Sequence, residues 1–235
     1  MMFTQSYRST VLRLSLALFL LATLAMADDA DVLEQARNLR VKEPQAALAL
    51  LDRNIAEPGE IELAADNAER MREQARGLEL RARILRDTGR REAAEQDAAR
   101  FERIAKALED PVRQARAQFM RGTIQAERGD IAGALERFHA ARRTLENTDA
   151  TAELARVTNA LGVAHNFTDA YARAREYYEQ ALELARRADN DALESTILGN
   201  LALVIAELEG AEAGLAAHRE ALALARERDD PELIA

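Results

Sequence analysis

The chain has 235 residues, of which 48% are apolar and 31% charged, and its formal net charge at pH 7 is −9. This composition is typical of a globular protein, and its acidity argues against nucleic acid or an anionic lipid surface as a partner. Cysteine is absent, which excludes disulfide bonds and thiol catalysis. Because aromatic residues make up only 4%, the core must rely on alanine and leucine, and we expect an all-α fold.

The first 27 residues have the order of a secretory signal peptide. Arg8 and Arg13, the only charged residues in this stretch, precede an apolar run at 14–25 and the ending Ala-Met-Ala at 25–27. As a helix this run would span about 18 Å, short of the ~30 Å hydrocarbon layer of a membrane. We therefore expect cleavage after Ala27 and export to the periplasm, which would change the net charge from −9 to −11. The alternative is an uncleaved membrane anchor.

Residues 28–70 predict a helical hairpin and a lead-in to the rest of the chain. Apolar residues recur at helical spacing in 31–40 and 45–54, and Pro44 interrupts the pattern between them. Pro58 and Gly59 indicate a loop at 57–60. Residues 71–110 then predict a further helix pair, which resembles the units that follow it but is degenerate.

A 40-residue period is the main feature of the sequence, and it divides the chain into units at 111–150, 151–190 and 191–230. Four columns of residues carry it: Gly122, Gly162 and Ala202; Ala134, Ala174 and Gly214; Phe138, Tyr178 and His218; Ala141, Ala181 and Ala221. Such self-similarity is typical of repeat architectures, in which each unit buries its apolar face against its neighbours. We therefore expect residues 28–235 to form a single domain.

Each unit reads as two helices joined by a polar turn, such as Arg128-Gly129-Asp130. Glycine suits the left-handed residue that ends a helix, and aspartate caps the next one. We expect the small residue of the first helix to face the small residue of the second, so that the two helices approach closely. The large residue four positions later would fill the space beside them.

The repeat resembles the tetratricopeptide family. Leu161-Gly162, Ala174, Tyr178 and Ala181 match its pattern of Leu-Gly in the first helix and Ala, aromatic and Ala in the second. The resemblance implies a right-handed superhelical α-solenoid of antiparallel helix pairs. Arg121 departs from the pattern, which has leucine there.

The last residues predict the start of a further repeat at 231–235. Pro231 aligns with Pro111, which stands where a first helix begins. On this reading the final complete unit would lack the neighbour that covers its apolar face, and we expect self-association or fraying there.

Few residues could support catalysis, and we expect no enzymatic activity, no cofactor and no metal. Ser195 is the only serine after position 27 and stands near the start of a helix, where we expect it to cap or face solvent. Among the histidines, we expect His165 to pack between helices, His218 to fill the aromatic column and His139 to face solvent. None has the spacing of a zinc site.

The resemblance places a partner-binding groove along the first helices of the units. The residues implied to line it are Arg116, Phe119, Thr123, Arg156, Asn159, Val163, Asn166 and Leu203. Apolar patches beside arginine and asparagine could hold an extended or helical peptide, and Arg116 and Arg156 could bind a carboxylate. The alternative is that Phe119 and Val163 only pack and that the arginines are solvated.

The combined prediction is an exported scaffold that binds a protein or peptide in its groove. The mature segment would not contact a membrane unless the full-length protein continues into a membrane helix. The alternative function is the periplasmic sensory region of a membrane-bound GGDEF diguanylate cyclase. The signal sequence, the opening at 32–37 with 47–51 and the long-period repeats resemble that class.

Overall fold

A computed structural model describes residues 29–55 and 67–227. The expected signal peptide at 1–27 and the expected start of a further repeat at 231–235 lie outside these residues. The described chain forms ten α-helices: α2 (Asp29–Leu39), α3 (Pro44–Asn54), α4 (Ala68–Asp87), α5 (Arg91–Ala107), α6 (Pro111–Glu127), α7 (Ile131–Leu145), α8 (Thr151–Asn166), α9 (Tyr171–Arg187), α10 (Asp191–Glu209) and α11 (Ala211–Glu227).

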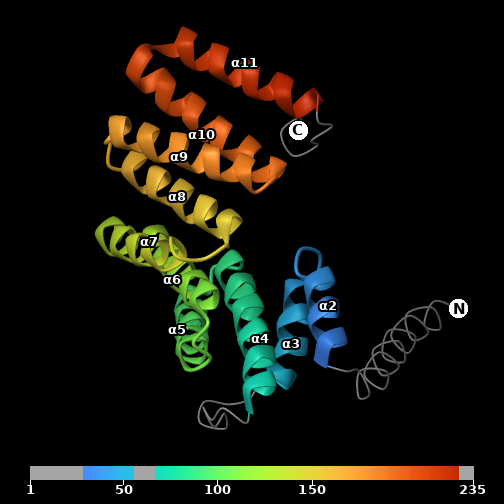
Figure 1. The fold of residues 1–235 in the computed structure, drawn as a ribbon. Coiled ribbons are helices and arrows are strands. Elements are labelled where there is room, and N and C mark those ends of the chain that lie inside the picture. The colour runs from blue at the N-terminus through green and yellow to red at the C-terminus, as the bar shows by residue number, and fades with distance from the viewer. Residues whose placement is uncertain (1–28, 56–66, 228–235) are drawn as a thin grey trace, which may run out of the picture.

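The helices form consecutive antiparallel pairs that stack in chain order along a curved path from α2 to α11 (Figure 1). The first helices of three units begin at Pro111, Thr151 and Asp191, which are 40 residues apart as the repeat requires. The predicted all-α solenoid is therefore confirmed. Each helix packs mainly on its neighbours in the sequence, so the core is a continuous layer between pairs rather than one central cluster.

Several of the turns between helices share one conformation. At Gly129 the backbone φ is +84°, and the amide of Asp130 then donates to the carbonyl of Gln125 at 3.0 Å. The Asp130 side chain accepts from the amide of Gly133 at 2.9 Å and caps α7, as the sequence predicts. Left-handed residues also end other helices: Gly89, Glu109, Asp169 and Asp189. Gly210, after α10, has a positive φ of +101° but an extended ψ of 162°.

Aromatic side chains of the second helices pack directly on glycines of the first. A Cβ placed on Gly122 would lie 2.7 Å from the ring of Phe138, and one placed on Gly162 would lie 2.6 Å from the ring of Tyr178. Tyr178 is 1% exposed. The closest neighbour of each glycine is therefore a ring, which is the large residue that the sequence places four positions after the small residue of the second helix. Glycine is needed because any side chain would push the ring away.

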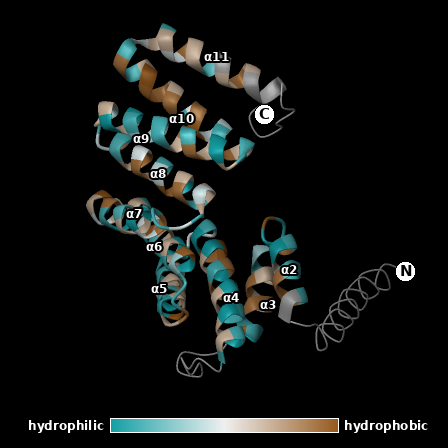
Figure 2. Cartoon of the chain, in the orientation of Figure 1, coloured by the Kyte–Doolittle hydropathy of each residue, from teal (hydrophilic) through white to brown (hydrophobic). Residues whose placement is uncertain are grey.

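The α10–α11 pair reverses this arrangement. A Cβ on Gly214 would lie 2.4 Å from that of Ala206 and 2.9 Å from the carbonyl oxygen of Ala202, so here the small residues do meet. His218 is exposed, and the expectation that it fills the aromatic column is wrong. With the two helices this close, the interface leaves no room for a ring at that position. Helix α10 carries many hydrophobic residues (Figure 2).

Arg121 occupies a position at which the tetratricopeptide pattern has leucine. Acidic side chains surround it and bind its guanidinium. Its guanidinium donates to Glu95 at 2.7 Å and to Glu102 at 2.6 Å, both on α5. Forty residues earlier, Arg81 binds Asp97 through two hydrogen bonds of 2.6 and 2.8 Å. Burial alone would raise the pKa of the Glu102 carboxyl, but its bonds to Lys106 and Arg121 outweigh burial and lower it. Ion pairs thus replace leucine packing in the first half of the solenoid.

Replacing Gly162 with alanine should destabilise the protein. The added methyl group must displace the Tyr178 ring in a close-packed interface, at a cost of about 1–3 kcal/mol. Gly199→Ala is the matched control, because Gly199 is also helical and a Cβ there meets no atom within 4 Å. That control should stabilise by about 0.5–1 kcal/mol through helix propensity. Urea unfolding would measure both changes, and a similar gain from both would show that the ring does not constrain Gly162.

Candidate functional site

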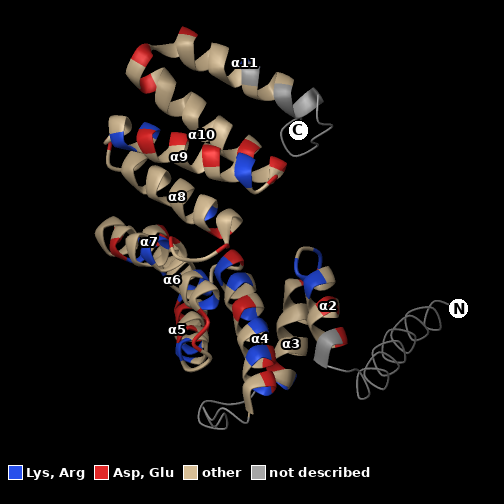
Figure 3. Cartoon of the chain, viewed as in Figure 1, with Lys and Arg blue, Asp and Glu red and all other residues tan. Residues whose placement is uncertain are grey.

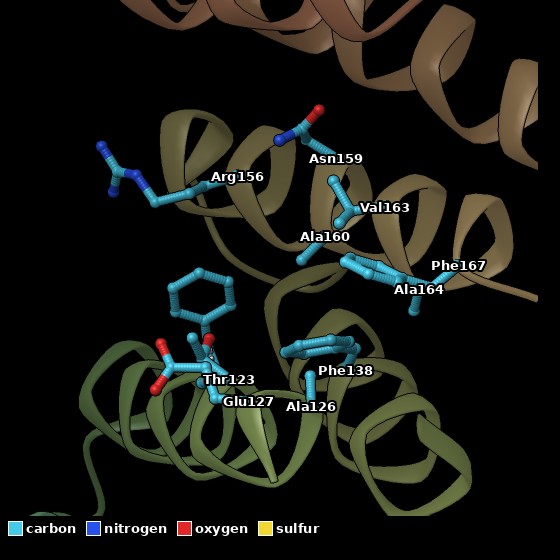
Figure 4. A pocket seen from close by; sticks show the side chains of 11 residues that line it. Thr123, Ala126, Glu127, Phe138, Arg156, Asn159, Ala160, Val163, Ala164 and Phe167 are labelled. Atoms are coloured by element: carbon cyan, nitrogen blue, oxygen red, sulfur yellow. Dashed lines mark hydrogen bonds between the residues drawn. The ribbon is translucent and has the colours of Figure 1, made fainter. Parts of the chain in front are cut away.

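An apolar pocket of about 310 Å³ lies between the first helices α6 and α8. Helix α6 supplies one wall, helix α8 the other, and Phe138 of α7 closes the base between them (Figure 4). The lining residues are Phe119, Thr123, Ala126, Glu127, Phe138, Arg156, Asn159, Ala160, Val163, Ala164 and Phe167.

Helical periodicity brings these side chains to one face. Phe119, Thr123 and Ala126 are spaced by four and three residues, so they share a stripe on α6. The Phe119 ring lies 5.8 Å from the ring of Phe138, tilted by 39°. The Thr123 hydroxyl donates to the backbone carbonyl of Phe119 at 3.0 Å, so its polar group is already satisfied. The pocket walls are therefore mainly apolar and aromatic.

The rim of the pocket is polar on one side and aromatic on the other. Asn159 accepts a hydrogen bond from Asn200 of α10 at 3.1 Å. Arg156 is exposed, and its side chain makes no ion pair within the part of the chain that the structure describes. Phe167, at the end of α8, is 73% exposed although phenylalanine usually avoids water. A ligand in the pocket would contact Asn159, Arg156 and Phe167.

A second cavity of about 640 Å³ adjoins the pocket and shares Phe119 and Arg156 with it. It lies along α4, α6 and α8, and its walls are strongly charged. Arg116 belongs to this cavity. Its guanidinium donates to Glu153 at 2.6 Å and lies 3.6 Å from Glu79.

The ion pair of Arg116 fixes the charge state of both partners. Burial alone would raise the pKa of the Glu153 carboxyl, but the hydrogen bond and charge of Arg116 outweigh it, and the net pKa is lowered. Burial alone would lower the pKa of Arg116, but Glu79 and Glu153 raise it. Arg116 therefore stays charged and is held in place before any partner binds.

The structure brings most of the sequence-predicted groove residues together. Phe119, Thr123, Arg156, Asn159 and Val163 line the apolar pocket, and Arg116 lies in the adjoining cavity. Asn166 is half-buried and lines neither cavity, and Leu203 is 63% exposed on α10, away from both. Their role in binding a partner stays a prediction.

Sequence reasoning missed the lining residues that α4 supplies. Glu79, Arg83 and Arg86 stand 40 residues before Phe119, Thr123 and Ala126, at the same positions of the repeat. Extending the period backwards into the degenerate unit would have found them. Phe138 was missed for another reason: it belongs to a second helix, and only tertiary packing carries it to the base of the pocket.

Ser195, the serine considered as a possible nucleophile, lies buried within a helix. Ser195 is 7% exposed within α10, so the expectation that it caps the helix or faces solvent is wrong. The cap of α10 is Asn190, whose side chain accepts from the amide of Leu193 at 3.1 Å.

Within residues 29–55 and 67–227, no group of three or more histidine or acidic side chains could hold a metal ion. No helix there has the length and apolarity to cross a bilayer.

The histidines of α7 and α8 form an aromatic cluster around Tyr177 of α9. His165 stacks on Tyr177 at 5.3 Å, which confirms that it packs between helices. His139 meets the same ring edge-on at 6.2 Å and is half-buried, where we expected it to face solvent. Arg142 lies over the ring at 5.7 Å. Burial lowers the pKa of both histidines, and the positive charge of Arg143 near His139 and of Arg173 near His165 lowers it further.

With this geometry described, the chain can be compared with known proteins. Residues 155–187, which include the last part of α8 and all of α9, match the family described as tetratricopeptide repeat. The matched segment corresponds to one tetratricopeptide repeat. No protein of curated function matches the sequence.

Solved structures share the fold of this chain at low sequence identity. The apo form of RapI aligns with a TM-score of 0.70 and 17% identity, over 87% of this chain and 72% of RapI. A Rap protein complexed with Competence and Sporulation Factor gives 0.69 and 12%, over 91% and 59%. Bacillus thuringiensis PlcR in complex with the peptide PapR7 and DNA gives 0.65 and 14%, over 86% and 71%. These likenesses establish a common fold.

Stability should decline as pH falls through the range in which the clustered histidines titrate. Since the pKa of His139 and of His165 is lowered in the folded state, the unfolded state binds more protons below about pH 6.5. The stability that the neutral rings contribute is complete above that pH and is lost as pH falls through the folded values. His165→Gln should flatten the dependence of melting temperature on pH between about 7.5 and 5.

The control for this measurement is His218→Gln, because His218 is exposed on α11. That variant should keep the pH dependence of the parent protein. An equal slope in the parent and in His165→Gln would show that the cluster does not set the acid sensitivity.

Proposed function

We propose that the chain is an interaction scaffold that binds a peptide, or an extended segment of a partner protein, along the first helices of its repeats. An apolar side chain of the partner would enter the pocket between α6 and α8. The observation that carries this proposal is the preformed pocket, whose apolar walls end at a rim with exposed Arg156 and Phe167. The proposal assigns no chemical step to the chain.

The size of the pocket suits one large side chain. Burying an aromatic side chain of about 150–200 Å² would contribute about 4–5 kcal/mol before the costs of association. Those costs are of similar size, so the pocket alone would give weak binding. Further contacts along α6 and α8 are needed for micromolar affinity, which corresponds to about −8 kcal/mol. Asn159 and Arg156 can supply such contacts to backbone or carboxylate groups of a peptide.

The structural neighbours support this proposal. The PlcR structure contains the peptide PapR7, and the Rap structure contains Competence and Sporulation Factor. Because those proteins share only the fold with this chain, their ligands are not transferred to it. What carries over to the proposal is that this arrangement of helix pairs can hold a ligand.

Selection from a random peptide library would test the proposed binding. Peptides enriched on the parent protein should carry a large apolar residue, and they should lose affinity at least about tenfold for Val163→Asp, which places a charge in the apolar wall. Val41→Asp is the matched control, because Val41 is 79% exposed in the turn between α2 and α3. It should bind the same peptides as the parent protein.

Two outcomes would contradict the proposal. One is that no peptide is enriched on the folded protein. The other is that enriched peptides bind Val163→Asp and the parent equally, which would place binding outside the pocket. Circular dichroism would establish that both variants remain helical before binding is compared.

We also propose that the protein is exported to the periplasm. The support is the sequence order at 1–27, where two arginines precede an apolar run and an Ala-Met-Ala ending. Expression of the whole chain should yield a periplasmic protein whose amino terminus, determined by mass spectrometry, is Asp28 or a close neighbour. Recovery of the intact chain from the cytosol, starting at Met1, would refute export.

The alternative proposal is the sensory region of a membrane-bound diguanylate cyclase. It is favoured by the signal-like start together with the opening at 32–37 and 47–51, which in the structure belongs to α2 and α3. The gene sequence after Ala235 discriminates the two. This alternative requires an apolar run of about 20 residues followed by a Gly-Gly-Asp/Glu-Glu-Phe motif, and it fails if they are absent.

A further inference from the structure

The charged cavity beside the apolar pocket has a composition unlike that of the whole chain. Although the net charge of the protein is −9, the cavity is lined by five arginines and two acidic residues. Two further acids outside the lining, Glu153 and Glu127, pair with Arg116 at 2.6 Å and with Arg86 at 3.6 Å. Its lining residues are Arg40, Glu79, Arg83, Arg86, Asp87, Arg116, Phe119, Met120 and Arg156. Helix α4 is densely charged along its length, whereas α8 carries few charges (Figure 3).

The arginines of this cavity are not fully neutralised by acids of the same chain. Arg116 is held by Glu153, and Arg86 donates to Asp87 at 2.6 Å. Arg83 has only a 3.7 Å contact with Glu79. Arg40 and Arg156 make no ion pair within the described residues. Burial lowers the pKa of Arg83, and repulsion from Arg40 and Arg86 adds to this effect. Cations crowded in this way favour an incoming anion.

The repeat explains why the cavity and the pocket are continuous. One register position is occupied by Arg83 on α4, Thr123 on α6 and Val163 on α8, and the inner face therefore changes from cationic to apolar along the solenoid. Arg156 and Phe119 border both regions. A ligand that extends along the first helices would meet the arginines first and the apolar pocket next.

We propose that the peptide bound by this groove has an acidic side-chain cluster next to its apolar anchor residue, with the carboxylates in the arginine cavity and the anchor in the pocket. This inference rests on the proposed peptide-binding function and specifies the partner's chemistry. Arginine forks bind carboxylates through paired hydrogen bonds, and Arg40, Arg83 and Arg156 are the three whose donors are least occupied.

Size and charge distinguish this ligand from two others. A single terminal carboxylate could pair with only one of Arg40, Arg83 and Arg156 in a cavity of about 640 Å³. Nucleic acid needs a basic track along several phosphates, but Glu79 and Asp87 interrupt the cavity, and the chain as a whole is acidic. Two or three aspartate or glutamate side chains confine their charge to a short segment and could pair with these arginines.

Fluorescence anisotropy with a synthetic probe would test this inference. The probe is an amidated, fluorescein-labelled heptapeptide whose central phenylalanine is flanked on each side by aspartate and glutamate. It should bind the parent protein in a saturable manner. The double variant Arg83→Gln, Arg156→Gln should weaken binding about tenfold or more, as should raising salt from about 50 to about 300 mM. Arg103→Gln should stay within about twofold, because Arg103 is exposed on α5 and lines neither cavity.

Matched probes separate the possible ligands. Replacing the acids with asparagine and glutamine, or the phenylalanine with serine, should each weaken binding about tenfold or more. The inference is overturned if the probe with asparagine and glutamine binds as well as the probe with aspartate and glutamate. That result would leave the proposed peptide-binding function intact. The inference is also overturned if a neutral peptide with a free terminal carboxylate binds as tightly, or if a short single-stranded oligonucleotide displaces the acidic probe at lower concentration.

Failure of the acidic probe to bind would refute the inference alone, since peptides from the library selection would still report on the pocket. Failure of both experiments would refute the proposed function as well. Thermal unfolding of each arginine variant would establish that its fold is retained.

Discussion

In the α6–α7 and α8–α9 pairs, the close approach of the first helix to the second is made possible by a glycine beneath an aromatic ring, and this contact determines much of the molecule. Gly122 allows the ring of Phe138 to lie where a Cβ would stand 2.7 Å from it. That ring also lies 5.8 Å from Phe119 and closes the base of the apolar pocket. One packing contact therefore sets both the geometry of a helix pair and the depth of the candidate site. A larger residue at 122 would move the ring and change the pocket.

The two halves of the solenoid fill the same repeat position with different residue types. Arg81 and Arg121 occupy the column that contains Leu161 and Leu201, and they are neutralised by acids on α5. A buried ion pair contributes little net stability compared with leucine, but losing one partner would leave an expensive unpaired charge. Each of these two arginines therefore depends on its acidic partners.

The candidate site has an exposed aromatic ring and a group of crowded arginines, and packing within the chain rarely explains either. Phe167 exposes most of its side chain beside the pocket, and several arginines crowd a cavity in an acidic protein. Neither feature stabilises the isolated chain, since one exposes apolar surface and the other concentrates like charges. A partner that covers the ring and neutralises the arginines would relieve both. The preformed shape of the groove would reduce the ordering cost of such binding.

The sequence by itself determined the helix pairs, their 40-residue spacing and the glycine turn with its aspartate cap, whereas the face of the first helices that lines the pocket was implied only by the resemblance to the tetratricopeptide family. The helix pairs, spacing and turn are local features. These features follow from local chemistry, because helical periodicity, caps and left-handed residues depend on residues a few positions apart. Only the tertiary structure decided which members of that face act together. It exposed His218 and buried Ser195, and it engaged Arg116 with Glu153 before any ligand arrives. It also added the arginines of α4 to the site. The physical reason is that contacts between units depend on side-chain volume and charge across an interface, and a repeat period does not specify these.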